Sequence, residues 1–600
     1  MSWNQNLNTS AKTHSKHAIA LRRILFFVLA LGSGCWLLWV THQMLSGQTS
    51  FAIHVLFLAL FSITLPWMVI GFWNALIGLL LCQLSKNPLR IVLPAQMQIQ
   101  NNEALHSNCA ILLCIRNEET RRVVCNAEAI IGGLLKEGVN SHFHFFILSD
   151  TNDAAIAEQE QLAFLELQQK WGAQFAITYR RRESNAGYKA GNIADFCKQW
   201  GAQFQFAITL DADSYMTSSA ILRLVRMMQA SPTLGILQGL VIGLPSTSAF
   251  TRLFQYGMRL GMRSYTMGSA WWQADCGPYW GHNAIIRLQP FIEHCQLPIL
   301  RTRSGQNRPI LSHDLLEALL MRRAGYAVRV YPQEDQNWEE NPPTLPEYIR
   351  RDLRWCEGNL QYIHLLTLPK LKLISRFQLL LAIFMFLGSP AWIGLITLTT
   401  VAVGLNGFSS TIVHNPYFYA LISIALLMWY LPKIAGALDV LLRKNESRRF
   451  GGRLIFSINM ILETLFSLLM TPIAWLNHTL FIISLMLGGK RGWSTQSRDA
   501  QRIHLGEAVR QFWPHTLLGL ALAAVLLSTQ PQALPYGLLF FGGLIVAIPL
   551  AIFTSQPGTG YFMVRNRLLS LPEEIHPPSA LAPLQLNALQ MQAHLNLKKT

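Results

Sequence analysis

Two aspartates separated by one residue are the first candidates for chemistry in this sequence. Asp211 and Asp213 directly follow a short apolar run, residues 204–210. Carboxylate oxygens at the end of a strand suit a divalent cation such as Mg²⁺, which binds through hard oxygen ligands together with substrate phosphates. Two acids in such a place can equally cap a helix or face solvent in a turn. Both interpretations stay open for the pair alone.

A basic segment that contains glycine, residues 180–192, lies upstream of the two aspartates. It holds three consecutive arginines and Lys189, together with Gly187 and Gly191. Cations and a permissive glycine backbone are typical of a loop around a diphosphate. The alternative is an exposed basic loop.

Three short apolar runs end in polar or acidic residues, and helical stretches lie between them. Residues 110–115 precede Arg116, residues 143–148 precede Ser149 and Asp150, and residues 204–210 precede Asp211. Strands that alternate with helices predict an open, Rossmann-like α/β sheet whose ligand crevice lies at the carboxyl ends of the strands. We therefore expect these acids to converge on one site.

Charged residues make up 14% of the 600-residue chain, whereas a soluble globular domain averages about 25%. The deficit lies in residues 24–85, 377–432, 454–489 and 511–564, which contain a single charged residue, Glu463. Uncharged apolar runs of this length are typical of membrane helices, so a plain soluble enzyme is excluded. An entirely membrane-embedded protein is also excluded, because the rest of the chain has an ordinary content of charge.

The formal net charge of +17 might suggest a nucleic-acid partner, but its placement argues against one. Basic residues such as Arg22, Arg23, Arg443 and Lys490 lie beside the apolar blocks, as the positive-inside rule expects on the cytoplasmic side. No recognised nucleic-acid motif accompanies the charge. The nine cysteines form neither a C-x-x-C pair nor a metal set with histidine, and we expect reduced thiols.

Hydropathy and charge predict about eight transmembrane helices with a polar domain inserted after the second. The expected divisions are a short cytoplasmic N-terminus (1–23), two membrane helices (24–85), a cytoplasmic α/β domain (86–375), about six membrane helices (376–554) with basic loops at 441–453 and 489–512, and a cytoplasmic tail (555–600). Residues 454–489 are basic at both ends, so they should cross an even number of times, as two short spans broken near Pro472 or as a re-entrant pair. The tail after Leu571 is expected to be loosely ordered.

Further motifs follow the aspartate pair in a fixed order. They are Tyr279-Trp280-Gly281-His282-Asn283-Ala284, Ser312-His313-Asp314 and Arg351-x-x-Arg354-Trp355. With the Asp-x-Asp, this order resembles the processive, membrane-embedded glycosyltransferases of family 2, which have the GT-A fold and include cellulose and hyaluronan synthases. The likeness covers about residues 51–577. It implies a GT-A domain inserted in a multi-span α-helical membrane bundle.

Several segments resemble in particular the members of that family that build the glucose backbone of osmoregulated periplasmic glucans. These segments are Gly71-Phe72-Trp73, Ser149-Asp150-Thr151, residues 187–196 and residues 351–361. Arg351 replaces the Gln of the family's Gln-x-x-Arg-Trp, and the Phe-x-Val-Thr signature of cellulose synthases is missing, which argues against cellulose or hyaluronan synthase. Trp493-Ser494-Thr495-Gln496 lies in a comparable loop, and the likeness suggests a gating role there.

The resemblance also assigns the donor side of the site. Asp150 would contact uracil, while Asp211 and Asp213 would bind the nucleotide and a Mg²⁺ (or Mn²⁺) ion, with Asp213 as the direct ligand. Lys189 would neutralise the diphosphate or contact the ribose, and Arg351 would lie beside the nucleotide. The alternatives are a turn aspartate at Asp150 and a solvated lysine at Lys189.

On the acceptor side, Asp314 is the candidate general base, because the acceptor hydroxyl must lose its proton as it attacks the anomeric carbon. Arg354 would stabilise the departing diphosphate, and Trp355 would stack on an acceptor sugar. The alternatives are an N-cap at Asp314 for a helix over 315–323, and helix packing for Arg354 and Trp355. The acceptor pocket would be framed by Trp280, Gly281, His282 and Asn283, through the backbone or through the His282 side chain.

The resemblance implies an inverting, processive transfer of glucose from UDP-glucose to a growing β-glucan, mainly β-1,2-linked, with passage of the product across the bacterial inner membrane. It also makes acyl carrier protein a candidate partner. One alternative is another membrane family-2 enzyme, such as a β-1,3 or β-1,4 glucan synthase or a lipid glycosyltransferase. A non-catalytic transporter is an alternative of another class, but it would not need the Asp-x-Asp and Arg-Trp motifs. A catalytically inactive scaffold is disfavoured, because each chemical position is filled.

Overall fold

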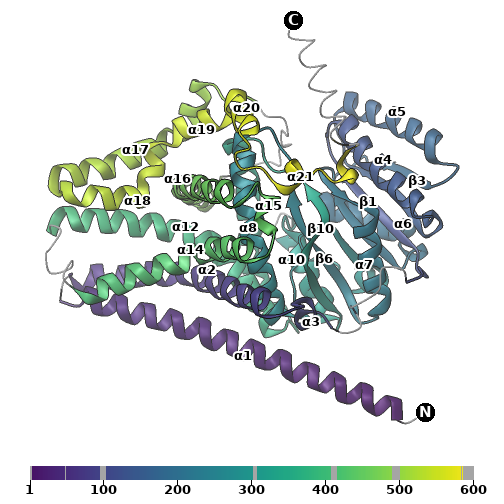
Figure 1. Cartoon of the computed structure of the whole chain (residues 1–600), viewed down its shortest axis with the longest axis horizontal. Helices are drawn as coiled ribbons and strands as arrows, with labels where there is room; N and C mark the ends of the chain where they lie inside the picture. The colour runs from purple at the N-terminus through teal and green to yellow at the C-terminus, as the bar shows by residue number, and fades with distance from the viewer. Residues whose placement is uncertain are drawn as a thin grey trace, which may run out of the picture.

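The computed structural model describes residues 3–47, 49–94, 97, 103–301, 307–406, 415–489, 501–582 and 584. Figure 1 shows long helices extending to one side and an α/β domain on the other, with α8 (Ala249–Gln273) between them. Short elements complete the described chain: α3 (Leu89–Val92), α15 (Glu446–Arg449), and a hairpin of β8 (Leu300–Arg301) and β9 (Asn307–Arg308).

An eight-stranded mixed sheet forms the centre of the α/β domain. In spatial order its strands are β3 (Ala176–Arg181), β2 (Phe143–Ser149), β1 (Cys109–Ile115), β4 (Phe206–Asp211), β7 (Ala284–Arg287), β6 (Leu234–Gly243), β10 (Ala327–Glu339) and β5 (Ser214–Met216). The first four are parallel, and so are β6 and β10, whereas β7 and β5 are antiparallel to their neighbours. The α/β class predicted from the apolar runs is confirmed, and β7 and β5 make the sheet mixed.

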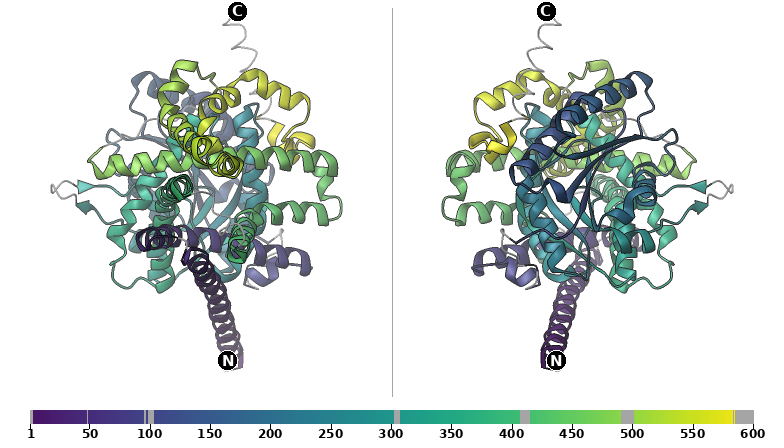
Figure 2. Two further views of the ribbon diagram at one scale, coloured as in Figure 1. Left: turned by 90° about the vertical axis from the view of Figure 1, so that its left-hand side faces the viewer. Right: turned by 90° about the vertical axis from the view of Figure 1, so that its right-hand side faces the viewer.

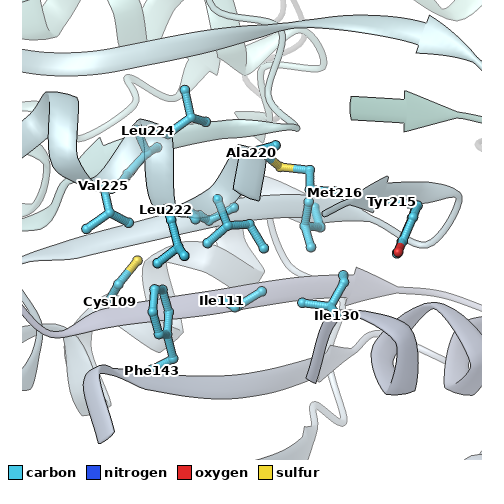
Figure 3. Close-up of a cluster of buried hydrophobic side chains, with 14 of the residues drawn as sticks. Cys109, Ile111, Ile130, Phe143, Tyr215, Met216, Ala220, Leu222, Leu224 and Val225 are labelled. Carbon is cyan, nitrogen blue, oxygen red and sulfur yellow. The ribbon is translucent and has the colours of Figure 1, made fainter. Parts of the chain in front are cut away.

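Helices cover both faces of the sheet, which explains why its strands are continuous apolar runs. One face carries α4 (Thr120–Lys136), α5 (Ala154–Trp171) and α7 (Ser218–Ala230), and the other carries α6 (Tyr188–Trp200), α9 (Leu288–His294) and α10 (His313–Arg323). Figure 3 shows part of the first layer, in which Ile130 of α4 and Leu222 of α7 lie beside Ile111 and Phe143 of the central strands. This buried packing holds the ends of β1, β2 and β4 in fixed positions.

Close backbone contact attaches α8 to the second long helix, α2 (Phe51–Leu84). A Cβ on Gly268 would lie 2.8 Å from the carbonyl carbon of Asn74, so no larger side chain fits between the helices. One turn further along, the indole nitrogen of Trp272 donates to Oδ1 of Asn74 at 2.8 Å. Packing through small residues and buried polar contacts is typical of membrane helices. The contact joins the α/β domain to the bundle.

Among the described residues, six helices are long and apolar enough to cross a membrane, or seven if one bent pair forms a single span. They are α1 (Trp3–Leu45), α2, α12 (Leu373–Asn406), α14 (Pro416–Leu442), α16 (Arg453–Met486) and α17 (Leu505–Thr529); the pair, bent by 55°, contains α18 (Leu534–Ile545) and α19 (Ala547–Ser555). The expected count of about eight is therefore too high for the part of the chain that is described.

The excess arises in residues 454–489, where two short spans broken near Pro472 were expected. These residues form one 34-residue helix, α16, with Pro472 in its interior, a position that neighbouring groups make tolerable in membrane helices. Figure 1 shows α16 nearly along its axis, whereas α12 and α17 lie close to the plane of the view, and Figure 2 shows the helix from the side. Because α16 lies crosswise to the bundle, both of its basic ends can lie on one side of a membrane without a second span.

Residues 572–582 of the C-terminal segment are folded against the domain, whereas a loose tail was expected after Leu571; beyond them the structure describes only residue 584. The segment follows α20 (Pro557–Arg565) and contains α21 (Pro572–Ile575). Two arginines of α8, each with a side chain only 1% exposed, hold it: Arg252 donates to Glu574 at 2.9 Å and Arg259 donates to Glu573 at 3.1 Å. The segment thus packs against the α/β domain through buried ion pairs.

Candidate active site

The predicted acids do converge at one edge of the sheet. Cys114 of β1 pairs with Asp211 of β4, and the next residue, Ile115, pairs with Ser149 at the end of β2. Asp150 follows Ser149, and its backbone N–H donates to the carbonyl of Ile115 at 2.9 Å. The ends of three adjacent parallel strands therefore bring Asp150 and Asp211 to the same crevice, as the strand pattern predicts.

Arg182 holds Asp150 in a bidentate ion pair. Its Nε and Nη2 donate to the two carboxylate oxygens at 2.6 and 2.8 Å, and its Nη1 donates to Asp195 at 3.0 Å. The Arg182 side chain is only 7% exposed, so the exposed-loop alternative for residues 180–192 is wrong at this position. Burial alone would lower the pKa of Arg182, but Asp150 and Asp195 raise it. The pair fixes the orientation of the proposed uracil-contacting acid.

Lys189 lies in the first turn of α6 and reaches across the crevice. Its ammonium donates to Asp211 and, at 2.8 Å, to the carbonyl of Gly281. Burial alone would lower the pKa of Lys189, but the negative charge of Asp211 raises it, with a further contribution from Asp314. The lysine is therefore a fixed cation at the sheet edge, and the alternative of a freely solvated side chain is wrong. Its contact with a diphosphate stays a prediction.

Asp213 and Glu339 make the other side of the crevice strongly acidic. Burial raises the pKa of Glu339, and Asp213 and Asp211 raise it further, against the opposing effect of His282. His282 Nε2 lies 3.5 Å from Glu339. Burial by itself would lower the pKa of His282, but Asp211 and Glu339 raise it. The site thus places a titratable imidazole beside two carboxylates, those of Asp211 and Glu339.

Asp211 and Asp213 are the residues that could hold a divalent cation. Within the described ranges, no three His, Cys, Asp or Glu side chains are grouped for a metal. Asp211 and Asp213 would supply two carboxylates, and the phosphates of a nucleotide would complete the shell, as is common for Mg²⁺. The acidic surroundings fit a cation, because the repulsion that raises the pKa of Glu339 would be relieved by positive charge.

The segment from Trp280 to Asn283 is built by its backbone. Gly281 has φ +81° and Asn283 has φ +51°, in the left-handed region that favours these residue types. Asn283 is fully buried and donates to Asn337 and, at 3.3 Å, to the carbonyl of Trp338. Trp280 is anchored through its backbone N–H, which donates to Gln238 at 2.8 Å. The main chain shapes this wall, while His282 faces the acids, so backbone and side chain both contribute.

Asp314 lies directly across from this wall. A Cβ built on Gly281 would be 3.4 Å from the Asp314 Cβ, and the charge of Asp314 contributes to the raised pKa of Lys189. Helix α10 begins at His313 with Ser312 as its N-cap, so the N-cap alternative for Asp314 is wrong. No hydrogen bond or ion pair engages the Asp314 carboxylate among the residues that the structure describes, which leaves it available to accept a proton.

Arg351, Arg354 and Trp355 lie on α11 (Leu345–Leu360). The guanidinium of Arg351 lies 4.8 Å from the ring centroid of Trp355 and 5.8 Å from that of Phe254, as in cation–π contacts. Trp355 is 47% exposed, so it is not a buried packing residue. An exposed indole with a cation on one side offers its other side to a ligand, and its stacking on a sugar stays a prediction.

Sequence reasoning missed four residues that contact the site. Arg182 was noted only as part of an arginine run, because its partner Asp150 is distant in sequence. Glu339, the last residue of β10, was not noted at all. Gly358 and Gln361 belong to the segment 351–361, which was noted only as a likeness. Trp493-Ser494-Thr495-Gln496, for which a gating role was suggested, lies outside the described residues.

Comparisons with known proteins point to one family. The family model described as "Glycosyl transferase family group 2" matches residues 206–433. A glucans biosynthesis glucosyltransferase H from Ralstonia nicotianae is 34% identical over 589 residues, covering 95% of this chain and 67% of its own length. Proteins of that name from Pseudomonas putida and Pseudomonas entomophila are 33% and 34% identical, covering 88% and 89% of this chain and 63% and 64% of theirs.

The chain thus spans about two thirds of the length of the curated relatives it matches. Among solved structures, the mannosyltransferase PcManGT from Pyrobaculum calidifontis, in complex with GDP-Man and Mn²⁺, covers 65% of this chain and 99% of its own at 15% identity. Its TM-score of 0.41 is too low to support any argument about this site. On the strength of the sequence relatives and the family model, the chain belongs to the glucans biosynthesis glucosyltransferase H family, within glycosyltransferase family 2.

Proposed function

We propose that this protein transfers glucose from UDP-glucose to the end of a growing β-glucan, by an inverting and processive reaction. One observation carries the proposal. Gly281 packs against Asp314 on one side, and its carbonyl accepts from Lys189, which pairs with Asp211. The candidate base and the candidate donor-binding residues thus meet around a single glycine.

The carboxylate of Asp314 would take the proton of the acceptor hydroxyl as its oxygen attacks the anomeric carbon. Trp355 would hold the acceptor sugar against its exposed face. No second carboxylate is assigned as a nucleophile, which is compatible with a single displacement and inversion.

The donor would lie along the sheet edge. Asp150, fixed by Arg182, would accept from the uracil, and Lys189 and Arg354 would neutralise the charge that develops on the departing diphosphate. Asp211 and Asp213 would hold Mg²⁺ or Mn²⁺, which supplies further stabilisation of the leaving group. Arg351 would act from beside Trp355 on the nucleotide side.

We further propose that the α/β domain and both ends of the chain lie in the cytosol, at the bacterial inner membrane. With α16 lying crosswise, α1, α2, α12, α14, α17 and the bent pair of α18 and α19 would cross, an even number that returns the chain to the same side. Basic residues at the ends of the apolar helices support this orientation. The product would leave through the bundle. Acyl carrier protein stays a prediction that no described contact supports.

The proposal is tested with purified full-length protein in detergent, given labelled UDP-glucose and Mg²⁺. We expect UDP release and a labelled polymer from the wild type, and a rate at least about 100-fold lower for Asp314→Asn, since general-base catalysis contributes about 10²–10⁴-fold. Glu166→Gln, at an exposed acid of α5, is the matched control, because it also replaces a carboxylate by its amide. Absence of polymer from the wild type, or equal rates for Asp314→Asn, would overturn the proposal. Linkage analysis of the polymer then separates β-1,2 from β-1,3 and β-1,4 products.

A further inference from the structure

The backbone directly before Asp314 is bound to the end of α11 by two side chains. Gln361 accepts from the N–H of Leu311 at 2.9 Å and donates to the carbonyl of Pro309 at 3.2 Å. Tyr362 donates its hydroxyl hydrogen to the carbonyl of Ser312 at 2.8 Å. Residues 309, 311 and 312 are therefore each held by a hydrogen bond with Gln361 or Tyr362, the two residues that follow α11.

A glycine permits this close approach. A Cβ on Gly358 would lie 2.8 Å from the backbone nitrogen of Ser312 and would overlap its hydroxyl. The obstructing atoms include backbone, which cannot turn away as a flexible side chain would. Any larger residue at 358 would push α11 and the start of α10 apart. Gly358 is itself buried within α11.

The contact sets the geometry of the site from both sides. Ser312 is the N-cap of α10, and Asp314 follows in its first turn. Arg354 and Trp355 lie one turn before Gly358 on α11, so they move with it as a rigid unit. The separation between the candidate base and the exposed indole is thus determined by the packing of Gly358 on Ser312.

Tyr362 also lies within electrostatic reach of the base. Burial raises the pKa of Tyr362 well above its ordinary range, and the charge of Asp314 raises it further. The phenol therefore stays protonated and remains a donor to Ser312 at any physiological pH.

We propose that Gln361 and Tyr362 are positioning residues that set the distance between Asp314 and an acceptor sugar on Trp355, and so decide whether the glucosyl group goes to a sugar hydroxyl or to water. The inference rests on the proposed function, in which Asp314 is the base. In transfer, the acceptor oxygen bonds to the anomeric carbon, the bond from that carbon to the diphosphate breaks, and Asp314 takes the acceptor proton. In hydrolysis, a water oxygen takes the place of the sugar oxygen, and the products are free glucose and UDP.

The test compares Gln361→Leu with the wild type, in the full-length detergent-purified protein, by measuring UDP release and glucose incorporated into polymer in the same reaction. Leucine keeps the approximate size of Gln361 but makes neither hydrogen bond. We expect polymer formation to fall by about tenfold to 100-fold, because misplacement by about 1 Å can cost that much. The KM for UDP-glucose should stay within about twofold, and the ratio of free glucose to polymer should rise severalfold.

Three further variants separate positioning from general damage. Gln361→Glu keeps the acceptor for Leu311 but loses the donor to Pro309, so its ratio of hydrolysis to transfer should lie between those of the wild type and Gln361→Leu. Tyr362→Phe removes one hydroxyl and should shift the ratio in the same direction, even if Gln361→Leu folds poorly. Gln289→Leu, at an exposed glutamine of α9 that donates to Glu293 at 3.1 Å, is the control and should behave as the wild type.

The inference is overturned if Gln361→Leu and Tyr362→Phe retain the wild-type ratio of hydrolysis to transfer, or if their loss of activity appears as a raised KM for UDP-glucose. Failure of the proposed function looks different. In that case the wild type forms no polymer from UDP-glucose, or Asp314→Asn keeps full activity, whatever the Gln361 variants do.

Discussion

His478 of α16 lies 2.7 Å from Asp352 of α11, measured from Nε2 to Oδ2, and its Nδ1 lies 2.8 Å from Oγ of Ser389 in α12. One imidazole therefore joins the helix that carries Arg354 and Trp355 to two long helices of the bundle. The Asp352 side chain is 14% exposed and the His478 side chain 10%. The catalytic domain and the bundle are thus linked by a largely buried polar chain.

Replacing this imidazole should weaken both stability and catalysis. His478→Ala leaves the carboxylate of Asp352 buried without its partner, which should cost about 1–3 kcal/mol. Loosening α11 should also lower kcat, because the helix positions Trp355. The measurement is the unfolding temperature in detergent together with the rate of polymer formation. His504→Ala, at an exposed histidine, is the control; an unfolding temperature equal to that of the wild type would contradict the expectation.

A second buried pair lies between α14 and α16. Lys433 donates to Glu463 at 2.7 Å and to Ser467 at 2.9 Å, and Glu463 is 3% exposed. Breaking such a pair by Glu463→Ala should destabilise the protein by about 3–5 kcal/mol, because it leaves an uncompensated buried charge. The double variant Glu463→Ala with Lys433→Met should recover most of the loss, and Lys433→Met alone completes the set. A double-mutant cycle on unfolding temperature measures the coupling, and additive losses would exclude it.

The gathering of the acidic residues at one edge of the sheet could be predicted from sequence, because the pattern that indicates it is local. Asp150 and Asp211 each follow an apolar strand, and parallel strands end at one edge of a sheet. The pairing of Lys433 with Glu463 was not visible, although Glu463 is the single charge within residues 454–489 and Lys433 directly follows the uncharged residues 377–432. Their contact depends on how two distant helices pack, which the local pattern does not encode.

The errors have the same physical origin. The positive-inside rule reports the side on which the ends of residues 454–489 lie, and it is equally satisfied by two spans or by one crosswise helix. The tail after Leu571 is held to α8 by charged contacts between residues more than 300 positions apart, and not by a regular apolar pattern of its own. Such contacts leave no short-range signature.

Removal of the ammonium of Lys189 should impair use of the donor. Lys189→Met keeps the length of the side chain but removes the charge that pairs with Asp211. We expect kcat/KM for UDP-glucose to fall by about 10²–10³, the usual cost of one charge-stabilising donor. Lys198→Met, on the exposed side of the same helix with its side chain 78% exposed, is the matched control. Equal losses in the two variants would mean that α6, rather than the charge, is responsible.

His282, which lies 3.5 Å from Glu339 at the acidic side of the crevice, predicts that the stability of the folded state depends on pH. His282 has a pKa raised above its ordinary 6.5, so protonation stabilises the folded state. This contribution is complete below pH about 6.5 and is lost as the pH rises through the higher folded pKa. The wild type should therefore exceed His282→Gln in unfolding temperature most at pH about 6, and the difference should shrink toward pH 9. A difference that grows with pH would contradict this assignment.

The C-terminal segment should detach when its ion pairs to α8 are broken. Arg259 binds both Glu334 and Glu573, and Glu573→Ala leaves this buried arginine with one carboxylate instead of two. We expect a loss of about 1–3 kcal/mol, since Glu334 still compensates the charge of Arg259. We also expect faster tryptic cleavage at the exposed Arg565 and Arg567, because the chain that follows them no longer packs down. The cleavage is followed by mass spectrometry of the released peptide. Glu507→Ala, at an exposed acid of α17, should leave the cleavage rate unchanged. If Glu573→Ala is cleaved no faster than this control, the ion pairs do not hold the segment, and its apolar contacts, such as that of Leu571 with the core, are sufficient.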